Sequence, residues 1–213
     1  MVLLVEGFGV KFTVVLRGPA PASVANDARS CELCAWSLRF HDLGLRPDYR
    51  KADGGLASAG NLSYRLRSGV DSFVITPSTT PAVGLSPREL VLVDKVDEAR
   101  RVVYARGAAG FKPSSEALMH HAVYAARRDV NAVFHGHSDE IVKQADTLGF
   151  VQTRRFHDYG TLELAREAVE TLGARDFIVL KNHGFLSVGA TMREAGERAI
   201  AAREKAIKAV EQK

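Results

Sequence analysis

Ala132-Val133-Phe134-His135-Gly136-His137-Ser138 is the run from which the organisation of this chain is best understood. Its three apolar residues predict a short buried strand, and two histidines follow directly. Side chains two positions apart on a strand point to the same side, so His135 and His137 emerge together at the strand end. Gly136 between them lets the backbone turn or lets a ligand approach closely.

A second apolar strand ends in the same way. Phe177-Ile178-Val179-Leu180 is soon followed by His183 and Gly184. Neutral imidazole suits zinc at about 2.0–2.1 Å, and three protein ligands leave one position open for substrate. The alternative interpretation is a set of hydrogen-bonded histidines at strand ends. The repeated His-Gly ending and a nearby acid favour the metal site, with His135, His137 and His183 as ligands.

The acid is Glu116, in the run Pro113-Ser114-Ser115-Glu116. This run predicts the start of a helix over 113–127, with Ser114 as N-cap and Glu116 in the first turn. A helix N-terminus attracts anions, so one interpretation has Ser114 and Ser115 holding a phosphate while Glu116 faces the metal. The other is plain N-capping with a favourable first-turn acid, and the local sequence alone favours it.

Two further polar loops carry candidate anion ligands. Asn61 lies in Gly60-Asn61-Leu62-Ser63, and Ser78 lies in Thr76-Pro77-Ser78-Thr79. Small hydroxyl and amide side chains on tight turns are good anion cradles. Taken alone, each of these segments is more often an ordinary turn.

The order of the predicted elements indicates the fold class. Hairpin-like strands come first, and strands interleave with helices later, which favours an α/β fold with a mixed, partly antiparallel sheet covered by helices on both faces. Strands are predicted at 10–16, 61–66, 72–76, 90–93, 101–105, 131–134 and 176–180, helices at 23–43, 113–127, 138–148, 162–172 and 191–210, and loops at 47–60 and 77–87.

Length and composition indicate one globular domain over 1–213. The chain has 213 residues, 46% of them apolar and 25% charged, which excludes a disordered chain. Its 29 basic and 25 acidic residues give a net charge of +4, which suits anionic metabolites. The basic residues form no stripe, so we expect no nucleic-acid partner.

Localisation is expected to be cytoplasmic. No stretch reaches the roughly 18 apolar residues that cross a bilayer, and the apolar opening at 1–5 lacks the basic leader of a signal peptide. The two cysteines, Cys31 and Cys34, fall in the predicted helix at 23–43, and we expect buried free thiols. So few cysteines fit a reducing compartment.

Seven short motifs, taken in order, resemble the class II aldolase/adducin family, whose familiar enzyme is L-fuculose-phosphate aldolase. The match covers roughly residues 23–205, and the strand-like segment 1–20 has no clear counterpart. The motifs are G-N-L-S (60–63), I-T-P-S (75–78), P-S-S-E (113–116), H-A-V-Y (121–124), A-V-F-H-G-H-S (132–138), G-T-L-E-L (160–164) and N-H-G-F-L (182–186).

The resemblance implies a three-layer αβα fold with a central, largely antiparallel sheet. It also implies a homotetramer of cyclic four-fold symmetry with active sites at subunit interfaces. Zinc would be held by His135, His137 and His183, and Glu116 would contact the resting zinc and act as base. The implied phosphate ligands are Asn61, Ser78, Ser114 and Ser115.

The activity implied is zinc-dependent aldol cleavage or synthesis in a short sugar phosphate, giving dihydroxyacetone phosphate and an aldehyde. Two departures from the family pattern bear on specificity. Thr79 stands where the family usually has glycine beside the phosphate. The segment 138–159 is shorter than in the fuculose enzyme and omits the stretch that carries its proton-donating tyrosine. Tyr159 aligns with a different aromatic residue. The residue that donates a proton to the aldehyde oxygen is therefore unassigned.

Three alternatives share this scaffold. A sugar-phosphate epimerase prefers aspartate at the position of Glu116, and a methylthioribulose-phosphate dehydratase lacks the Ser-Ser-Glu cluster. An adducin-like binding module would keep the fold without catalysis. The presence of all three histidines together with Glu116 favours the aldolase.

Overall fold

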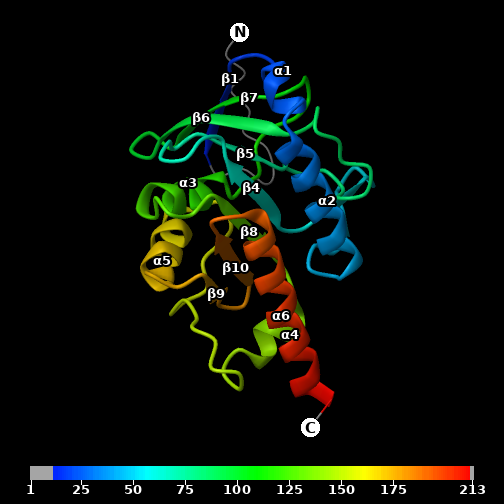
Figure 1. Ribbon diagram of the computed structural model, residues 1–213, viewed down its shortest axis with the longest axis vertical. Coiled ribbons are helices and arrows are strands. Elements are labelled where there is room, and N and C mark those ends of the chain that lie inside the picture. Colours follow the sequence, from blue (N-terminus) through cyan, green and yellow to red (C-terminus); the bar gives the residue numbers. More distant parts are fainter. Residues whose placement is uncertain (1–11, 212–213) are drawn as a thin grey trace.

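Eight strands form one sheet in the computed structural model, which describes residues 12–211 (Figure 1). Only β1 and β7 pair in parallel, and the other neighbouring strands of this sheet are antiparallel. The predicted mixed, largely antiparallel sheet is therefore confirmed. In spatial order the strands are β1 (Thr13–Leu16), β7 (Val102–Arg106), β6 (Val91–Asp97), β5 (Phe73–Ile75), β4 (Asn61–Arg65), β8 (Ala132–Gly136), β10 (Gly184–Gly189) and β9 (Phe177–Leu180).

Helices cover both faces of this sheet, so the predicted three layers are confirmed. One face packs against α2 (Ala28–Asp42), α4 (Asp139–Gln144) and α6 (Met192–Glu211), and the other against α3 (Ala117–Ala126) and α5 (Leu162–Leu172). Strand β8 shows the alternation that divides the core. Val133 belongs to the cluster under α3 and α5, whereas Ala132 and Phe134 belong to the cluster under α2 and α6.

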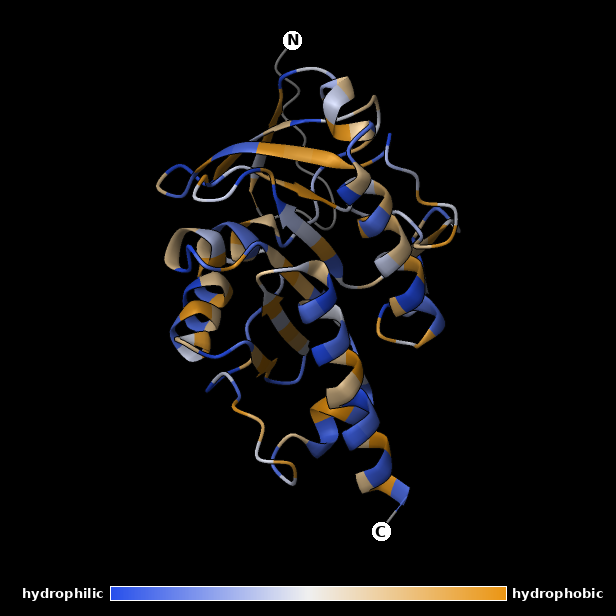
Figure 2. Ribbon diagram, viewed as in Figure 1, coloured by the Kyte–Doolittle hydropathy of each residue, from blue (hydrophilic) through white to orange (hydrophobic). Residues whose placement is uncertain are grey.

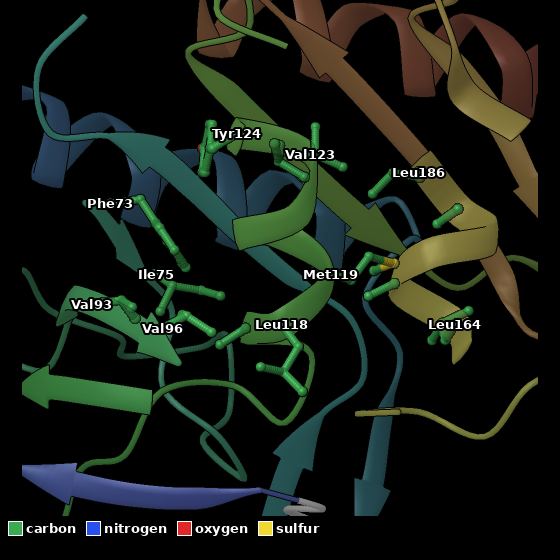
Figure 3. Packing of buried hydrophobic residues seen from close by; sticks show 14 of the residues in the cluster. Phe73, Ile75, Val93, Val96, Leu118, Met119, Val123, Tyr124, Leu164 and Leu186 are labelled. Carbon is green, nitrogen blue, oxygen red and sulfur yellow. The ribbon is translucent and has the colours of Figure 1, made fainter. Parts of the chain in front are cut away.

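The core under α3 fixes how that helix lies on the sheet. Figure 3 shows the apolar side chains of α3 pointing onto the strands beneath it. Burial of each such large side chain contributes about 2 kcal/mol, so the orientation of α3 is firmly set. The labelled members of this cluster are Phe73, Ile75, Val93, Val96 and Leu186 of the sheet, Leu118, Met119, Val123 and Tyr124 of α3, and Leu164 of α5.

Aromatic rings dominate the opposite core. The rings of Phe40 and Phe134 meet edge to face with centroids 5.4 Å apart, and Trp36 lies 6.0 Å from Phe134 in a similar geometry. Helix α6 crosses this cluster closely, because a Cβ at Gly196 would lie 2.4 Å from the Trp36 ring. Figure 2 shows hydrophilic and hydrophobic residues alternating along α6, as expected for a helix with one buried side.

Four element predictions need correction. The predicted helix 23–43 is two helices, α1 (Ala22–Ala25) and α2, because Asp27 caps α2 by accepting a hydrogen bond from the Arg29 N–H at 2.9 Å. The predicted loop 47–60 contains a hairpin of β2 (Asp48–Arg50) and β3 (Leu56–Ser58), whose mostly exposed residues lack an apolar pattern. Strand β10 was not predicted. Of the strand predicted at 10–16, residues 10 and 11 lie outside the described residues, as does most of the segment 1–20.

The fourth correction concerns Ser114. Helix α3 begins at Ala117 with Glu116 at its N-cap position and no side-chain cap, so the prediction of Ser114 as N-cap is wrong. An isolated bridge between Pro77 and Pro113 holds the preceding backbone extended, which delays the helix. The Ser114 hydroxyl accepts from the Glu116 N–H at 3.3 Å, a local turn of the kind serine often makes.

The expected burial of both cysteines is also wrong. Cys31 is exposed on α2, and Cys34 is half-buried with its pKa raised to about 12, chiefly by burial. Within residues 12–211, no helix combines the length and the apolar character needed to cross a membrane.

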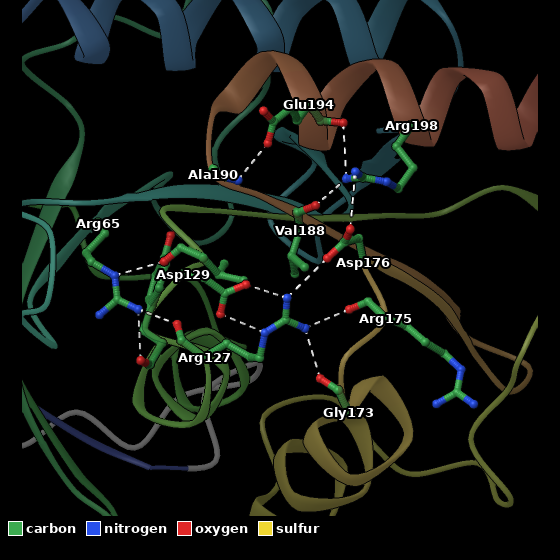
Figure 4. Close-up of polar contacts among 12 residues, drawn as sticks. Arg65, Arg127, Asp129, Gly173, Arg175, Asp176, Val188, Ala190, Glu194 and Arg198 are labelled. Atoms are coloured by element: carbon green, nitrogen blue, oxygen red, sulfur yellow. Dashed lines mark hydrogen bonds and ion pairs between the residues drawn. The ribbon is translucent and has the colours of Figure 1, made fainter.

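Arg127, just after α3, ties three elements together (Figure 4). Its guanidinium donates to the carbonyls of Gly173 and Arg175, both at 2.9 Å, at the C-terminal end of α5. It also pairs with Asp129 at 2.6 Å and with Asp176 at 3.2 Å, before β9. Its side chain is only 17% exposed, so these bonds are partly shielded from water.

We expect Arg127→Ala to lower the free energy of unfolding by about 1–3 kcal/mol, because it leaves two carbonyls and the Asp129 carboxylate without a charged donor, and leaves Asp176 with Arg198 alone. Urea unfolding at a fixed protein concentration measures this. Arg128→Ala is the matched control, since Arg128 is 57% exposed, and should stay within about 0.5 kcal/mol of the parent. Equal losses in both variants would contradict the structural role of Arg127.

Candidate metal centre

Three imidazoles converge at one end of strands β8 and β10. His135 is on β8, His137 follows β8, and His183 lies between β9 and β10. The Nε2 atoms of His135 and His137 are 3.1 Å apart, and the three ring centroids are separated by 4.9, 4.9 and 5.0 Å. Their ligand atoms all lie within 4.8 Å of one another, a spacing that is able to hold a metal ion. The structure thus brings together the three histidines that the sequence singled out.

Small residues allow the two strands to approach at this point. Gly136 on β8 lies opposite Phe185 on β10. A Cβ at Gly184 would lie 2.3 Å from the Gly136 carbonyl oxygen and 3.2 Å from Cε1 of His135. Any larger residue at position 184 would therefore clash with the Gly136 backbone and disturb the pairing of β8 with β10 beside His135.

The proton of His135 is fixed by its backbone partner. Its Nδ1 lies 2.8 Å from the carbonyl oxygen of Phe185, which can only accept, so Nδ1 carries the hydrogen. A neutral His135 ring then presents the Nε2 lone pair to the other two rings. A backbone carbonyl that orients a ligand imidazole in this way is the usual support of a histidine metal ligand.

Glu116 closes the cluster from the start of α3. Its carboxylate is 3% exposed, with Oε2 at 3.0 Å from Nε2 of His135 and Oε1 at 3.5 Å from Nε2 of His183. Burial alone would raise the pKa of Glu116, but His135, His183 and His137 together hold that pKa well below its ordinary range. Glu116 is therefore an ionised carboxylate beside three imidazoles.

The same electrostatics act on the histidines. Burial alone would lower the pKa of His135, but the Glu116 carboxylate raises it. The pKa of His137 is lowered to about 3, by burial and then by His135, and burial also lowers the pKa of His183. Neutral rings are the form that binds a metal.

The donor set fits a divalent cation. Oε1 of Glu116 is buried and accepts no hydrogen bond from any of the residues in 12–211, and Nδ1 of His183 is likewise unpaired. Two imidazole Nε2 atoms only 3.1 Å apart, with a carboxylate beside them, form a concentrated set of lone pairs. Such a set is stabilised by a cation at its centre.

The buried side chain of His120, which the sequence did not single out, lies behind Glu116 and is linked to it through Asn61. Asn61 donates from Nδ2 to Oε2 of Glu116 at 2.8 Å, and its Oδ1 lies 2.6 Å from Nε2 of His120. His120 in turn contacts the hydroxyl of Ser63 through Nδ1 at 2.6 Å. The sequence offered one indication of a role for His120, because a residue four positions after Glu116 on a helix lies on the same face as Glu116.

The remaining predicted site residues lie on two adjacent segments. The segment that contains Ser78 and the one that contains Ser114 and Ser115 lie side by side, because Pro77 and Pro113 form a β-bridge. The backbone N–H of Ser78 also donates to the carbonyl of Lys112 at 2.9 Å. Ser114 is buried, whereas Ser78 and Ser115 are half-buried. Asn61 uses both ends of its amide inside the protein, as described above. The phosphate-binding role of these residues stays a prediction.

Thr79 adopts φ 54°, in the left-handed region that disfavours β-branched residues. This is the position at which a glycine was expected from the family pattern. The backbone conformation that suits glycine is thus kept, although the residue is threonine.

Comparison with known proteins gives a consistent result. The family model described as "Class II Aldolase and Adducin N-terminal domain" matches residues 50–208. A 5-methylthioribulose-1-phosphate/5-deoxyribulose-1-phosphate aldolase of Rhodospirillum rubrum is 32% identical over 163 residues, which cover 69% of this chain and 68% of the relative. An L-fuculose phosphate aldolase of Methanococcus vannielii is 31% identical, with coverage of 66% and 77%.

The solved structures agree at the level of the fold. A sugar-phosphate aldolase from Thermotoga maritima superimposes with a TM-score of 0.68 at 17% identity, covering 86% of this chain and 94% of that one. At so low an identity the likeness supports the arrangement of helices and strands alone.

Proposed function

The chain belongs to the class II aldolase and adducin family and is an enzyme of the aldolase type, and we propose that it uses zinc to make or break a carbon–carbon bond in a short sugar phosphate. The single observation that carries this proposal is the convergence of His135, His137 and His183 on the ionised carboxylate of Glu116. An adducin-like binding module would have no need of a buried carboxylate with an unpaired oxygen.

The residues of the centre divide the work in this proposal. A divalent ion held by the three imidazoles would act as a Lewis acid on the oxygens of the substrate and would offset the negative charge that develops there. Glu116 removes the proton from the carbon next to the carbonyl in the synthetic direction and returns it in the cleavage direction. Its Oε1 is the oxygen suited to this task, because Asn61 already occupies Oε2.

The phosphate of the substrate is assigned to the neighbouring polar segments. Ser78, Ser114 and Ser115 supply hydroxyl donors close to the start of α3, and the Asn61 amide has one N–H that does not bond to Glu116. Neutral donors on rigid backbone suit an anion that must also be released. The net charge of +4 supports attraction of a phosphorylated substrate.

One observation favours an aldehyde with an apolar end. Phe156 is 52% exposed, and its ring centroid lies 6.5 Å from that of His183. An apolar ring beside the centre suits a methyl or methylthio substituent better than a hydroxylated one. The R. rubrum relative is named for 5-methylthioribulose-1-phosphate and 5-deoxyribulose-1-phosphate, which have such ends.

The assembly is proposed to be a homotetramer with shared active sites. Phe156 is 52% exposed with its ring centroid 6.5 Å from that of His183, and a neighbouring subunit would cover this apolar surface near the centre. Light scattering of the purified protein tests the subunit number.

The proposed reaction is tested by incubating the zinc-loaded protein with dihydroxyacetone phosphate and acetaldehyde, methylthioacetaldehyde or lactaldehyde. We expect sugar-phosphate formation with all three and the highest kcat/KM for the first two. Exchange of the substrate carbon-bound hydrogen with D2O, followed by NMR, tests proton removal without any aldehyde. A protein that binds zinc but performs neither reaction would refute the proposed function.

The metal assignment predicts that His183→Ala loses zinc. Removing one of three ligands should weaken zinc binding by more than the roughly 10- to 100-fold typical for residues that only support a ligand. The zinc content after dialysis, measured by mass spectrometry of the metal, reports this. His121→Ala, a histidine on α3 outside the cluster, should keep the zinc content of the parent.

The base assignment predicts that Glu116→Gln still binds zinc through the three histidines, with an affinity weakened about 10- to 100-fold by loss of the neighbouring carboxylate charge, and loses turnover. Glutamine retains the volume and an oxygen but cannot accept a proton at neutral pH. We expect kcat to fall by about 10²- to 10⁴-fold, with KM changed only a few-fold. Full activity in this variant would assign the proton transfer to another group.

A further inference from the structure

A chain of hydrogen bonds runs from Glu116 into the core and includes a histidine that the reaction does not use directly. His120, Ser63 and Tyr124 are fully buried, and Asn61 is 4% exposed. The links measure 2.8 Å from Asn61 to Glu116, 2.6 Å from His120 to Asn61, 2.6 Å from Ser63 to His120 and 2.8 Å from Tyr124 to Ser63. Each member is therefore held by the next.

The carboxylate end of the chain sets the direction of every bond. An ionised Glu116 can only accept, so Asn61 must turn its Nδ2 toward it and its carbonyl Oδ1 toward His120. Oδ1 can also only accept, which requires a hydrogen on Nε2 of His120. The neutral ring then has its lone pair on Nδ1, and Ser63 donates to it. Tyr124 completes the chain by donating to the oxygen of Ser63.

The ring of His120 is kept in this state by its surroundings. It stacks on Phe73, with centroids 6.4 Å apart and an interplanar angle of 23°. Burial, followed by the nearby His135, lowers the pKa of His120 to about 3, so the ring stays neutral at physiological pH. A neutral ring with two opposite hydrogen-bond partners has only one arrangement that satisfies both.

We propose that His120 is a positioning residue for Glu116, holding the Asn61 amide in the one orientation that binds Oε2 and leaves Oε1 directed at the metal centre. This inference rests on the proposed function, because it assigns a task to the free oxygen of Glu116. An asparagine amide can rotate by 180° with little change in shape. Rotation here would bring the Asn61 carbonyl against the carboxylate, and the hydrogen on Nε2 of His120 prevents it.

The proposal distinguishes the two nitrogens of the His120 ring, and this makes it testable. In His120→Gln the side-chain amide reaches the position of Nε2 and still donates to Asn61. In His120→Asn the amide reaches only the position of Nδ1, which faces Ser63. His120→Leu removes both partners while keeping an apolar volume. His121→Gln, on the adjacent position of α3, is the matched control and should behave like the parent.

Two measurements are made on each zinc-loaded variant: steady-state kinetics, and zinc affinity by competition with a chromogenic chelator. We expect His120→Asn and His120→Leu to lose about 10- to 100-fold in both kcat and zinc affinity, with KM for the sugar phosphate within about 3-fold of the parent. His120→Gln should recover most of both losses. Equal values for the glutamine and leucine variants, whether high or low, would overturn the proposal, since packing alone would then explain the residue.

Ser63→Ala covers the case in which the His120 variants do not fold. It deletes one hydroxyl, frees Nδ1 of His120, and should give a smaller loss of about 3- to 10-fold in zinc affinity at unchanged KM. No change in Ser63→Ala would count against the proposal. If the parent binds zinc without aldol or exchange activity, the proposed function fails, whereas the order of zinc affinities still decides the role of His120.

Discussion

The register between β8 and β10 governs everything at the metal centre. It sets Gly136 opposite Phe185 and His135 opposite Leu186, so the turn that carries His183 rises directly beside His135 and His137. A slip of β8 by one residue against β10 would move Phe134 away from the face that holds Phe185 and turn His135 away from its partners. The aromatic core under α2 resists such a slip, because Phe40 and Phe134 pack edge to face. Apolar packing under α2 thus fixes the positions of the three histidines at the ends of β8 and β10.

The second requirement is a carboxylate that remains charged while buried. Burial of an unpaired carboxylate costs several kcal/mol, and Glu116 has three imidazoles and one amide to offset that cost. Its position follows from α3, whose apolar face is held by the sheet strands and by α5 (Figure 3). Because Glu116 is at the N-cap of that helix and His120 is one turn further, a single rigid element carries both the carboxylate and the support behind it.

Much of this was predictable from local sequence, and the failures have common causes. Helix α5 (Leu162–Leu172) was predicted to the residue because its apolar spacing is strong and Gly173 ends it. The convergence of His183 with His135 and His137 was also predicted, because both strands end in His-Gly. Ser114 was misplaced because the bridge from Pro77 to Pro113 is a long-range constraint that no local pattern reveals. His120 was overlooked because its partners, Asn61 and Ser63, lie far away in the sequence, at separations of 59 and 57 positions.

Arg46 links the scaffold to the electrostatics of the centre. It follows α2, is 2% exposed, donates to Ser37 and to the carbonyl of Ala59, and has its pKa lowered to about 10 by burial, so it remains a cation at neutral pH. Its positive charge acts to lower the pKa of His135 and of His137, against the effect of Glu116. The backbone beside it also reaches the site, since the carbonyl of Leu45 accepts from the His137 N–H at 2.8 Å. The buried cation therefore favours neutral, metal-binding imidazoles against the opposing effect of Glu116, while the imidazoles keep the Glu116 carboxylate ionised.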